Sequence, residues 1–293
     1  MTRELWLGLD VGSTTVKAAL VDPDTITLLF STYLRHGAQQ SAVVATLLEE
    51  LSRRFAGARV RCAVCGSGGR GIAEEIDAYY IQEVVANSIA VREFHPESRV
   101  AIELGGQDAK VVFFHYDPES RQLMASDMRM NGSCAGGTGA FLDEVASLLQ
   151  IPIEEFDDFA ARGERVYDIS GRCGVFAKSD IQPLLNQGVS RENIALSTYH
   201  AIARQTKGGL AQGLEIRPPV IFVGGPLTFN HTLVEVFAER LGLDDSGRIV
   251  PDSPQTLVAY GAALSVGSMF VDRESSFSLF SALLAALCAS IIL

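Results

Sequence analysis

The chain has 293 residues, of which 47% are hydrophobic, so it can bury a large core in one domain or in two lobes. Asp and Glu outnumber Lys and Arg by 35 to 24, which gives a net charge of -11. This charge repels nucleic-acid phosphate and anionic membrane surfaces, and the sequence has no local basic patch to offset it. Nucleic acid is therefore excluded as a partner.

The chain has five cysteines, an odd number spread thinly, and it starts without a signal peptide. We therefore expect a cytoplasmic protein with reduced thiols that can bind metal. Residues Ser275–Leu293 carry no charge and are apolar on every helical face, at the short limit for a bilayer span. This tail is expected to be a membrane anchor or, equally, a buried helix, a partner-binding helix or a junction where a longer chain was cut.

The N-terminal region predicts strands before helices. Strands at Leu5–Leu9 and Val16–Val21 flank a turn at Gly12–Thr15 and form a β-hairpin, and a third strand is expected at Ile26–Tyr33. Helix, strand and helix then follow at Val43–Phe55, Arg59–Val64 and Ile81–Phe94, with the loop CGSGGRG after the strand.

The same pattern restarts at Arg99–Leu104, a strand that enters a glycine-rich turn. Ala109–His115 is its predicted hairpin partner, and Gln122–Asp127 can add a third strand. Because strand, acid-bearing glycine turn and strand occur twice, the sequence predicts two related α/β lobes.

The rest of the chain is predicted to be mainly helical, with a buried strand at Val220–Val223. Ser190 is expected to cap the longest helical segment, and Ser179 to cap a short turn. The predicted helices are Thr138–Leu149, Glu154–Ala161, Ser190 to about Leu214, Thr232–Leu241 and Gln255–Met269.

The first glycine-rich turn carries residues suited to phosphate and magnesium. Gly12 permits close backbone approach, hydroxyl and N–H groups can donate to phosphate oxygens, and Asp10 can hold Mg²⁺ through water. A lone turn of this kind is an ordinary hairpin more often than a nucleotide site. The predicted nucleotide-binding residues are Gly12, Ser13, Thr14, Thr15 and Lys17, and Asp10 is a predicted catalytic residue.

Further glycine-rich segments favour a nucleotide site over an ordinary hairpin. The turn at Gly105–Asp108 repeats the first and could grip a triphosphate from the other side, with Gln107 or Asp108 orienting the attacking water. A third segment follows the buried strand, where adenine or ribose could lie against the backbone. The predicted nucleotide-binding residues here are Gly105, Gly106, Gln107, Gly137, Gly224, Gly225 and Pro226, with Gln107 and Asp108 also catalytic.

The motifs DVGSTT, ELGGQD, FVGGP and YGAALS stand in an order and spacing that resemble the acetate and sugar kinase, heat-shock ATPase and actin superfamily. This resemblance implies an α/β fold class: two ribonuclease-H-like lobes, the actin-like ATPase fold, around a nucleotide cleft that holds ATP or ADP with Mg²⁺. We expect the lobes at residues 1–96 and 97–270, with 271–293 as a separate apolar tail.

A narrower resemblance covers about residues 5–268. The segments MNGSCAGGTGAFLDEVA and ISGRCGVFAKSDI resemble the two cysteine signatures of the activators of 2-hydroxyacyl-CoA dehydratases, the BadF/BadG/BcrA/BcrD family of ATP-dependent iron–sulfur reductases. Glu103 departs from the family, which usually has Asp at the start of the second phosphate loop. The tail after about Val271 lies outside the resemblance.

Cys134 and Cys173 are the metal ligands that this resemblance implies. Cys134 precedes the helix expected near Thr138, whose N-terminal dipole favours a thiolate, and the N–H groups of Gly136 and Gly137 can donate to cluster sulfide. Two thiolates cannot complete a four-iron cluster. A symmetric homodimer supplies four, which agrees with the resemblance to a [4Fe-4S] cluster that bridges two subunits.

Two of the remaining cysteines and the histidines are interpreted as structural residues, not as metal ligands. Cys62 and Cys65 form a C-x-x-C motif, but no second pair completes a zinc site, so we interpret them as core and loop thiols. The five histidines are scattered without metal spacing and are interpreted as surface or packing residues: His36, His95, His115, His200 and His231.

The resulting hypothesis is an ATP-powered, low-potential electron donor. Ferredoxin or flavodoxin would reduce the shared cluster, and nucleotide turnover would drive transfer to a 2-hydroxyacyl-CoA dehydratase, a benzoyl-CoA reductase or a related iron–sulfur protein. Two alternatives remain open from the residues: a small-molecule kinase of the same superfamily, and an ATP-dependent assembly protein of the actin kind. A membrane enters only if the tail inserts.

Overall fold

A computed structural model describes residues 3–119, 121–132, 136–172, 174–269 and 278–291. The chain forms two compact units: unit 1 combines Met1–Pro96 with Gln255–Leu293, and unit 2 is Glu97–Pro254. The boundary after residue 96 matches the expected one. The chain from residue 255 onward differs, because it joins unit 1, whereas we expected residues up to 270 in the C-terminal lobe.

Unit 1 is built on a mixed sheet. Its strands are β1 (Glu4–Val11), β2 (Thr15–Asp22), β3 (Thr27–Arg35), β4 (Arg59–Cys65), β5 (Tyr79–Tyr80) and β11 (Ser278–Leu279). The order is β11-β4-β1-β2-β3, with β5 also paired to β4. The strand β1 is antiparallel to β2 and parallel to β4, and Asp10 therefore lies opposite Lys17 in the register.

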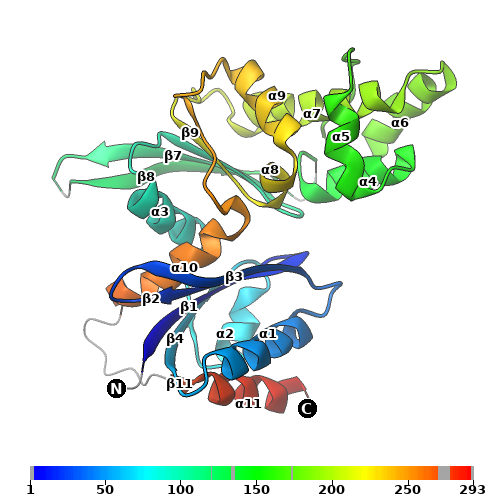
Figure 1. Cartoon of the computed structure of the whole chain (residues 1–293). Helices are drawn as coiled ribbons and strands as arrows, with labels where there is room; N and C mark the ends of the chain where they lie inside the picture. The colour runs from blue at the N-terminus through cyan, green and yellow to red at the C-terminus, as the bar shows by residue number, and fades with distance from the viewer. Residues whose placement is uncertain (1–2, 120, 133–135, 173, 270–277, 292–293) are drawn as a thin grey trace. The chain divides into compact units, whose positions relative to one another are not determined.

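Helices cover both faces of this sheet (Figure 1). One face packs against α1 (Gln40–Arg54), α2 (Gly69–Glu75) and α11 (Phe280–Ile291), and the other against α3 (Glu83–Phe94) and α10 (Leu257–Met269). Two glycines let α10 approach closely. A Cβ built on Gly8 would lie 1.9 Å from the Ala259 carbonyl oxygen, and one on Gly261 would lie 1.8 Å from that of Ala86. This tight packing is why α10 belongs to unit 1.

The apolar tail supplies β11 and α11. Phe280, Leu283 and Leu287 recur at helical spacing and are buried in the core formed with α1 and α2. The tail therefore takes the buried-helix alternative. Within the described residues, no helix combines the length and the hydropathy needed to cross a bilayer.

Unit 2 repeats the topology of unit 1. Its strands are β6 (Val100–Leu104), β7 (Ala109–Asp117), β8 (Gln122–Met130), β9 (Val220–Val223) and β10 (Arg248–Ile249). The sheet order is β10-β9-β6-β7-β8, in which β6 is antiparallel to β7 and parallel to β9. The repeated arrangement confirms the predicted α/β fold class of two ribonuclease-H-like lobes, the actin-like ATPase fold.

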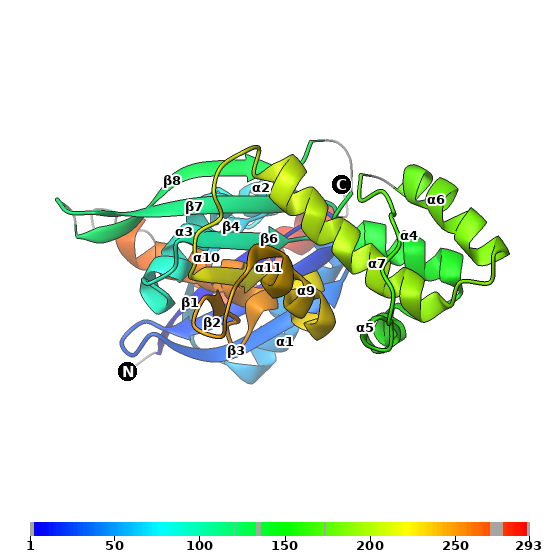
Figure 2. The ribbon, with the colours of Figure 1, turned by 90° about the horizontal axis from the view of Figure 1, so that it is seen from above.

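The helices of unit 2 share one large core with its sheet. In Figure 2 the long helix α7 runs beside α4 and α9. The helices are α4 (Gly139–Leu149), α5 (Phe156–Ala161), α6 (Gly174–Asn186), α7 (Arg191–Arg204), α8 (Gly225–Phe229) and α9 (His231–Leu241), with short turns η1 (Ile153–Glu155) and η2 (Gln205–Leu210). A further short turn, η3 (Pro254–Thr256), lies where the chain passes from unit 2 back to unit 1.

Two local predictions were wrong. The loop CGSGGRG was expected to contain no helix, but α2 begins within it at Gly69. Ser179 was expected to cap a turn, but it lies inside α6, where its hydroxyl donates to the Val175 carbonyl one helical turn earlier. Ser190 does cap α7, because its hydroxyl accepts from the Asn193 N–H.

Candidate nucleotide and cluster site

The acid of the first turn, Asp10, lies buried at the end of β1. Its Oδ2 accepts a hydrogen bond from Lys17 Nζ at 2.9 Å, across the hairpin. Its Oδ1 is also buried and has no hydrogen-bond partner among the described residues. A buried carboxylate oxygen without a hydrogen bond destabilises the folded protein, and Mg²⁺ or a water bound to Mg²⁺ would satisfy it. Asp10 therefore fits the predicted metal role.

The turn itself is held in a fixed conformation. The Gly12 N–H donates to the Thr15 carbonyl at 2.9 Å, and the His36 N–H donates to the Thr14 carbonyl at 3.2 Å. His36 Nε2 lies 3.1 Å from the Gly12 carbonyl oxygen. His36 is buried, so it packs as predicted for a histidine, but no sequence motif indicated that its ring contacts the first turn.

A second loop of unit 1 approaches the same acid. A Cβ built on Gly66 would lie 2.6 Å from Asp10 Oδ1 and 2.3 Å from the Val11 carbonyl oxygen. Gly66 also has a positive φ of 92°, which disfavours any other residue. Only glycine fits here, and the loop CGSGGRG thus borders the predicted metal site, a position that no pattern in the sequence indicated.

The second turn, Gly105–Asp108, repeats the closing hydrogen bond and the pairing of acid and lysine of the first. The Gly105 N–H donates to the Asp108 carbonyl at 2.7 Å. Glu103 is buried and lies 3.5 Å from Lys110 Nζ, again with the acid and the lysine seven residues apart. The longer Glu side chain therefore keeps the cross-hairpin pairing that Asp10 has, and Lys110 also pairs with Asp108.

The first turn of α4 is bonded directly to this second turn. Gly139 N–H donates to the Gly105 carbonyl at 2.9 Å, and Ala140 N–H donates to the Gly106 carbonyl at 2.7 Å. Thr138 is the buried N-cap residue. Two of the backbone donors that a helix start leaves unsatisfied are thus satisfied by the predicted phosphate loop. Any movement of that loop must move the start of α4 or break these bonds.

The third glycine-rich segment of the sequence lies against the second turn and the start of α4, all within unit 2. A Cβ built on Gly139 would lie 3.4 Å from Pro226 Cγ and 3.4 Å from the Gly105 carbonyl oxygen. Gly224 has a φ of 96°, and a Cβ there would lie 2.1 Å from the Leu104 carbonyl oxygen. Unit 2 therefore brings together its second turn, Gly105–Asp108, and Gly224–Pro226 around Gly139, two residues after Gly137.

A buried polar network ties α8 to α7. Asn230 Nδ2 donates to the Pro226 carbonyl at 2.7 Å, and the Tyr199 hydroxyl lies 2.7 Å from Asn230 Oδ1 and 3.1 Å from Asp157 Oδ1. Burial, followed by the nearby Asp157 carboxylate, raises the pKa of Tyr199, so the hydroxyl keeps its proton. The third segment is thus anchored to α7 through Asn230.

The C-terminal end of α7 continues into the π-helical turn η2. The Gln205 side chain lies there between two glycines. A Cβ built on Gly137 would lie 3.9 Å from Gln205 Cγ, and a Cβ built on Gly171 would lie 3.2 Å from Gln205 Cβ. Turns of this kind are frequent at functional sites. A cavity of about 160 Å³ borders η2, Asn131 and Gly136.

Cys134 and Cys173 lie outside the described residues, but their neighbours in sequence meet. A Cβ built on Gly136 would lie 1.8 Å from the carbonyl oxygen of Arg172, which directly precedes Cys173. The helix α6 starts at Gly174, immediately after Cys173, and α4 starts five residues after Cys134. Both predicted ligands therefore precede helices, and their chain segments touch.

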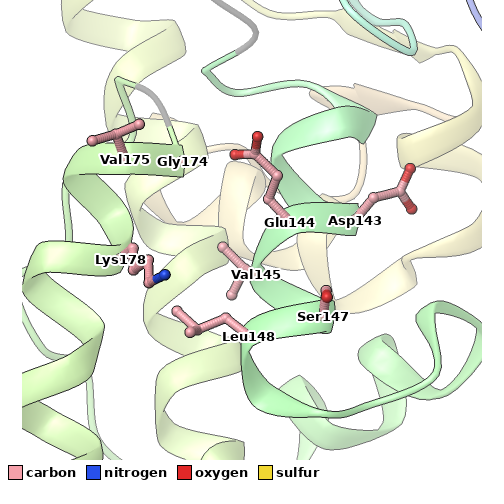
Figure 3. A pocket seen from close by; sticks show the side chains of 8 residues that line it. All are labelled: Asp143, Glu144, Val145, Ser147, Leu148, Gly174, Val175 and Lys178. Carbon is pink, nitrogen blue, oxygen red and sulfur yellow. The ribbon is translucent and has the colours of Figure 1, made fainter.

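A groove of about 550 Å³ lies between the second half of α4 and the start of α6 (Figure 3). Its lining combines apolar side chains with acids from α4 and a lysine from α6: Asp143, Glu144, Val145, Ser147, Leu148, Gly174, Val175 and Lys178. Val175 is 77% exposed and the adjacent Phe176 is 60% exposed. Large apolar side chains therefore face solvent within three residues of Cys173.

The other cysteine and histidine predictions are largely confirmed. Cys62 and Cys65 are both buried, in cores on opposite faces of β4, and burial raises the pKa of the Cys62 thiol. Cys65 ends the strand and is not in the loop. His200 is buried and its Nδ1 accepts from Arg240 Nε at 2.9 Å. Burial, then Arg240, lower the pKa of His200.

Comparison with known proteins gives consistent matches. The model of the BadF/BadG/BcrA/BcrD ATPase family matches residues 7–266. The chain is 30% identical to the 2-hydroxyisocaproyl-CoA dehydratase activator of Clostridioides difficile, over 88% of this chain and 93% of the relative. It is 27% identical to the (R)-2-hydroxyglutaryl-CoA dehydratase activating ATPase of Acidaminococcus fermentans, over 88% and 94%. The structure of the Clostridium difficile activator with bound ADPNP has a TM-score of 0.74 at 26% identity, over 99% of this chain and 98% of that one.

Proposed function

Because the chain belongs to the BadF/BadG/BcrA/BcrD ATPase family, we propose that it is an ATP-dependent activator that delivers a low-potential electron to an iron–sulfur partner. The partner would be a 2-hydroxyacyl-CoA dehydratase, as named for two relatives, or a benzoyl-CoA reductase type of enzyme. The electron would come from reduced ferredoxin or flavodoxin.

The observation that carries this proposal is the direct bonding between the second phosphate turn and α4. The N–H groups of Gly139 and Ala140 donate to the carbonyls of Gly105 and Gly106, and α4 follows the Cys134 loop in sequence. Nucleotide binding that rotates these peptide groups would weaken or realign both bonds. The Cys134 loop would then respond to the presence of the γ-phosphate, as a two-state coupling requires.

We assign the hydrolytic chemistry to the two turns. Asp10 would hold Mg²⁺ through its unsatisfied Oδ1, and the backbone N–H groups of Ser13–Thr15 would bind phosphate oxygens. Gln107 or Asp108 would orient the attacking water, and Gly224–Pro226 would contact adenine or ribose. Binding of this kind stabilises charge on the transferred phosphoryl group without covalent chemistry by the protein.

The residues around the cysteines fit a bridging cluster. Gly136 and Arg172 touch, so each chain would offer two thiolates from adjacent segments, and a homodimer would offer four. A [4Fe-4S] cluster supplies a one-electron carrier whose potential depends on the surrounding hydrogen bonds and charge. The helix starts at Gly139 and Gly174 would stabilise thiolate charge through their dipoles.

Exposed apolar groups near Cys173 support a protein partner at this end of unit 2. Val175 and Phe176 expose most of their surface to solvent in the single chain, which is unfavourable unless another protein covers them. A second copy and an iron–sulfur partner are the expected occupants. Neither the kinase nor the assembly alternative explains two cysteine segments that touch.

The proposal is tested by anaerobic purification, iron and sulfide assay, and mass determination in solution. We expect a brown, oxygen-sensitive dimer with about four irons per pair of chains. Cys134→Ser should lose the iron and keep ADPNP binding, and Cys65→Ser, the matched control, should keep both. A colourless protein that hydrolyses ATP as a monomer would overturn the proposal.

A further inference from the structure

We infer that His36 is a positioning residue for the first phosphate turn, and that its Nε2–H turns the backbone of Gly12–Thr15 toward the nucleotide. The inference rests on the proposed nucleotide-binding role of this turn. His36 follows β3, the neighbour of β2, and it is 5% exposed. It makes two contacts with the turn, one from its backbone and one from its ring.

The bonding of the ring identifies its tautomer. The Ala38 N–H donates to His36 Nδ1 at 3.0 Å, so Nδ1 is an acceptor and carries no proton. A neutral imidazole then carries its proton on Nε2, which donates to the Gly12 carbonyl at 3.1 Å. Each ring nitrogen thus has one backbone partner, and both partners act to fix the plane of the ring.

The segment after His36 holds an unfavourable backbone conformation that makes this bonding possible. Gly37 has a φ of 52° and Ala38 a φ of 65°, and the left-handed region is disfavoured for alanine. This turn brings the Ala38 N–H back onto the His36 ring. Because such strain persists only where surrounding contacts hold it, it points to a functional constraint on the ring.

Peptide planarity then determines which groups the turn presents. In a trans peptide, the carbonyl of one residue and the N–H of the next lie on opposite sides. The Gly12 carbonyl accepts from the His36 ring, so the Ser13 N–H is directed away from His36. The Thr14 carbonyl accepts from the His36 N–H, so the Thr15 N–H is directed away as well. His36 thereby directs both N–H groups away from itself, the Ser13 N–H through its ring and the Thr15 N–H through its backbone.

Glutamine and asparagine separate the two functions of the ring. Glutamine at position 36 can place an N–H donor where Nε2 lies, and asparagine can place only an acceptor where Nδ1 lies. The matched controls are Ala38→Gly, which keeps the Ala38 N–H and relieves the strain, and His115→Ala, a change at an exposed histidine.

The test measures ADPNP affinity by calorimetry and thermal unfolding for each variant. We expect about tenfold weaker binding for His36→Asn, the loss of one well-formed hydrogen bond, and less than about threefold for His36→Gln and both controls. Equal affinities of the Asn and Gln variants, whether both unchanged or both reduced, would overturn the inference. A wild-type protein that does not bind ADPNP would instead refute the nucleotide role of the turn.

A second measurement is made on the wild-type protein and needs a variant only to assign one signal. Histidine-labelled wild-type protein gives ¹⁵N–¹H spectra that distinguish the two neutral tautomers, and His36→Gln identifies the signal of His36. We expect protonated Nε2 and a change in its ¹⁵N shift on adding ADPNP. A proton on Nδ1, or a shift unchanged by saturating ADPNP, would contradict the inference.

Discussion

The turns at Gly12–Thr15 and Gly105–Asp108 share one backbone design but are supported by different neighbours. Both close with a hydrogen bond from the first glycine to the fourth residue, and both lie beside a cross-hairpin pair of acid and lysine. The first turn is braced by His36 beside it and leaves Asp10 Oδ1 unsatisfied. The second is braced by the start of α4. We therefore propose that the repeated turn holds a metal ion in unit 1 and transmits movement to α4 in unit 2.

The largest expected difference is between the two acids. Asp10→Asn removes the charge that would hold Mg²⁺, and metal assistance contributes several kcal/mol to phosphoryl transfer, so we expect an ATPase rate lower by about a hundredfold. Glu103→Gln, the matched change, should cost less than about tenfold, because Lys110 keeps Asp108 as a partner. Equal losses of kcat in the two folded variants would contradict the proposal that only Asp10 holds Mg²⁺.

The second largest effect is expected where the segments before Cys173 and after Cys134 touch, and it concerns stability and iron content. Gly136→Ala places a Cβ against the Arg172 carbonyl, which is backbone and cannot rotate away, so overpacking should destabilise unit 2 by about 1–3 kcal/mol. We also expect loss of most of the bound iron. Gly132→Ala is the matched control, since a Cβ there meets nothing within 4 Å. Full iron content in Gly136→Ala, measured after anaerobic purification, would contradict the proposed position of the ligands.

The bonds between the second turn and α4 can be weakened singly. Ala140→Pro removes the N–H that donates to Gly106, and proline is tolerated in the first turn of a helix. Loss of this bond should cost about 1 kcal/mol and should reduce the protection that ADPNP gives to amides of residues 136–149 in hydrogen exchange. Glu192→Pro makes the same change in the first turn of α7 and should leave that protection intact. The coupling would be refuted by protection unchanged in Ala140→Pro.

The smallest expected effect is a pH dependence of stability that arises at His200, where α7 contacts α9. The pKa of His200 is lowered in the folded state, so below about pH 6.5 the unfolded chain binds a proton that the folded chain does not. The free energy of unfolding therefore falls as the pH drops from about 6.5 toward the folded pKa. His200→Gln should flatten this slope in urea titrations, whereas the exposed His231→Gln should keep it. An unchanged slope in His200→Gln would assign the dependence to another group.

The sequence allowed the fold to be predicted well because its signals are local and repeated. Strand periodicity, acid-bearing glycine turns and helix caps such as Ser190 predicted every strand longer than two residues and most of the long helices, but not α6. The assignment of α10 to unit 1 was missed because it depends on close approaches at Gly8 and Gly261 that no local pattern encodes. The apolar tail was ambiguous for the same reason, since only its packing on α1 distinguishes a core helix from an anchor.

The candidate site was predicted in part. Glycine spacing and the cysteine signatures identified the phosphate turns and the segments that meet at Gly136 and Arg172. His36 could not be found, because a single histidine after a strand carries no motif, and its role depends on a strained turn at Gly37 and Ala38. The bonds from α4 to the second turn were missed as well, because backbone contacts leave no residue signature.

Transmission from the second turn to the cysteine segments is tested most directly by the rate at which a chelator removes iron from the anaerobic dimer with ADP or with ADPNP bound. We predict different rates for the two nucleotides in the wild-type protein, and a difference reduced toward zero in Ala140→Pro. Identical rates with saturating ADP and ADPNP in an iron-loaded wild-type dimer would contradict the coupling.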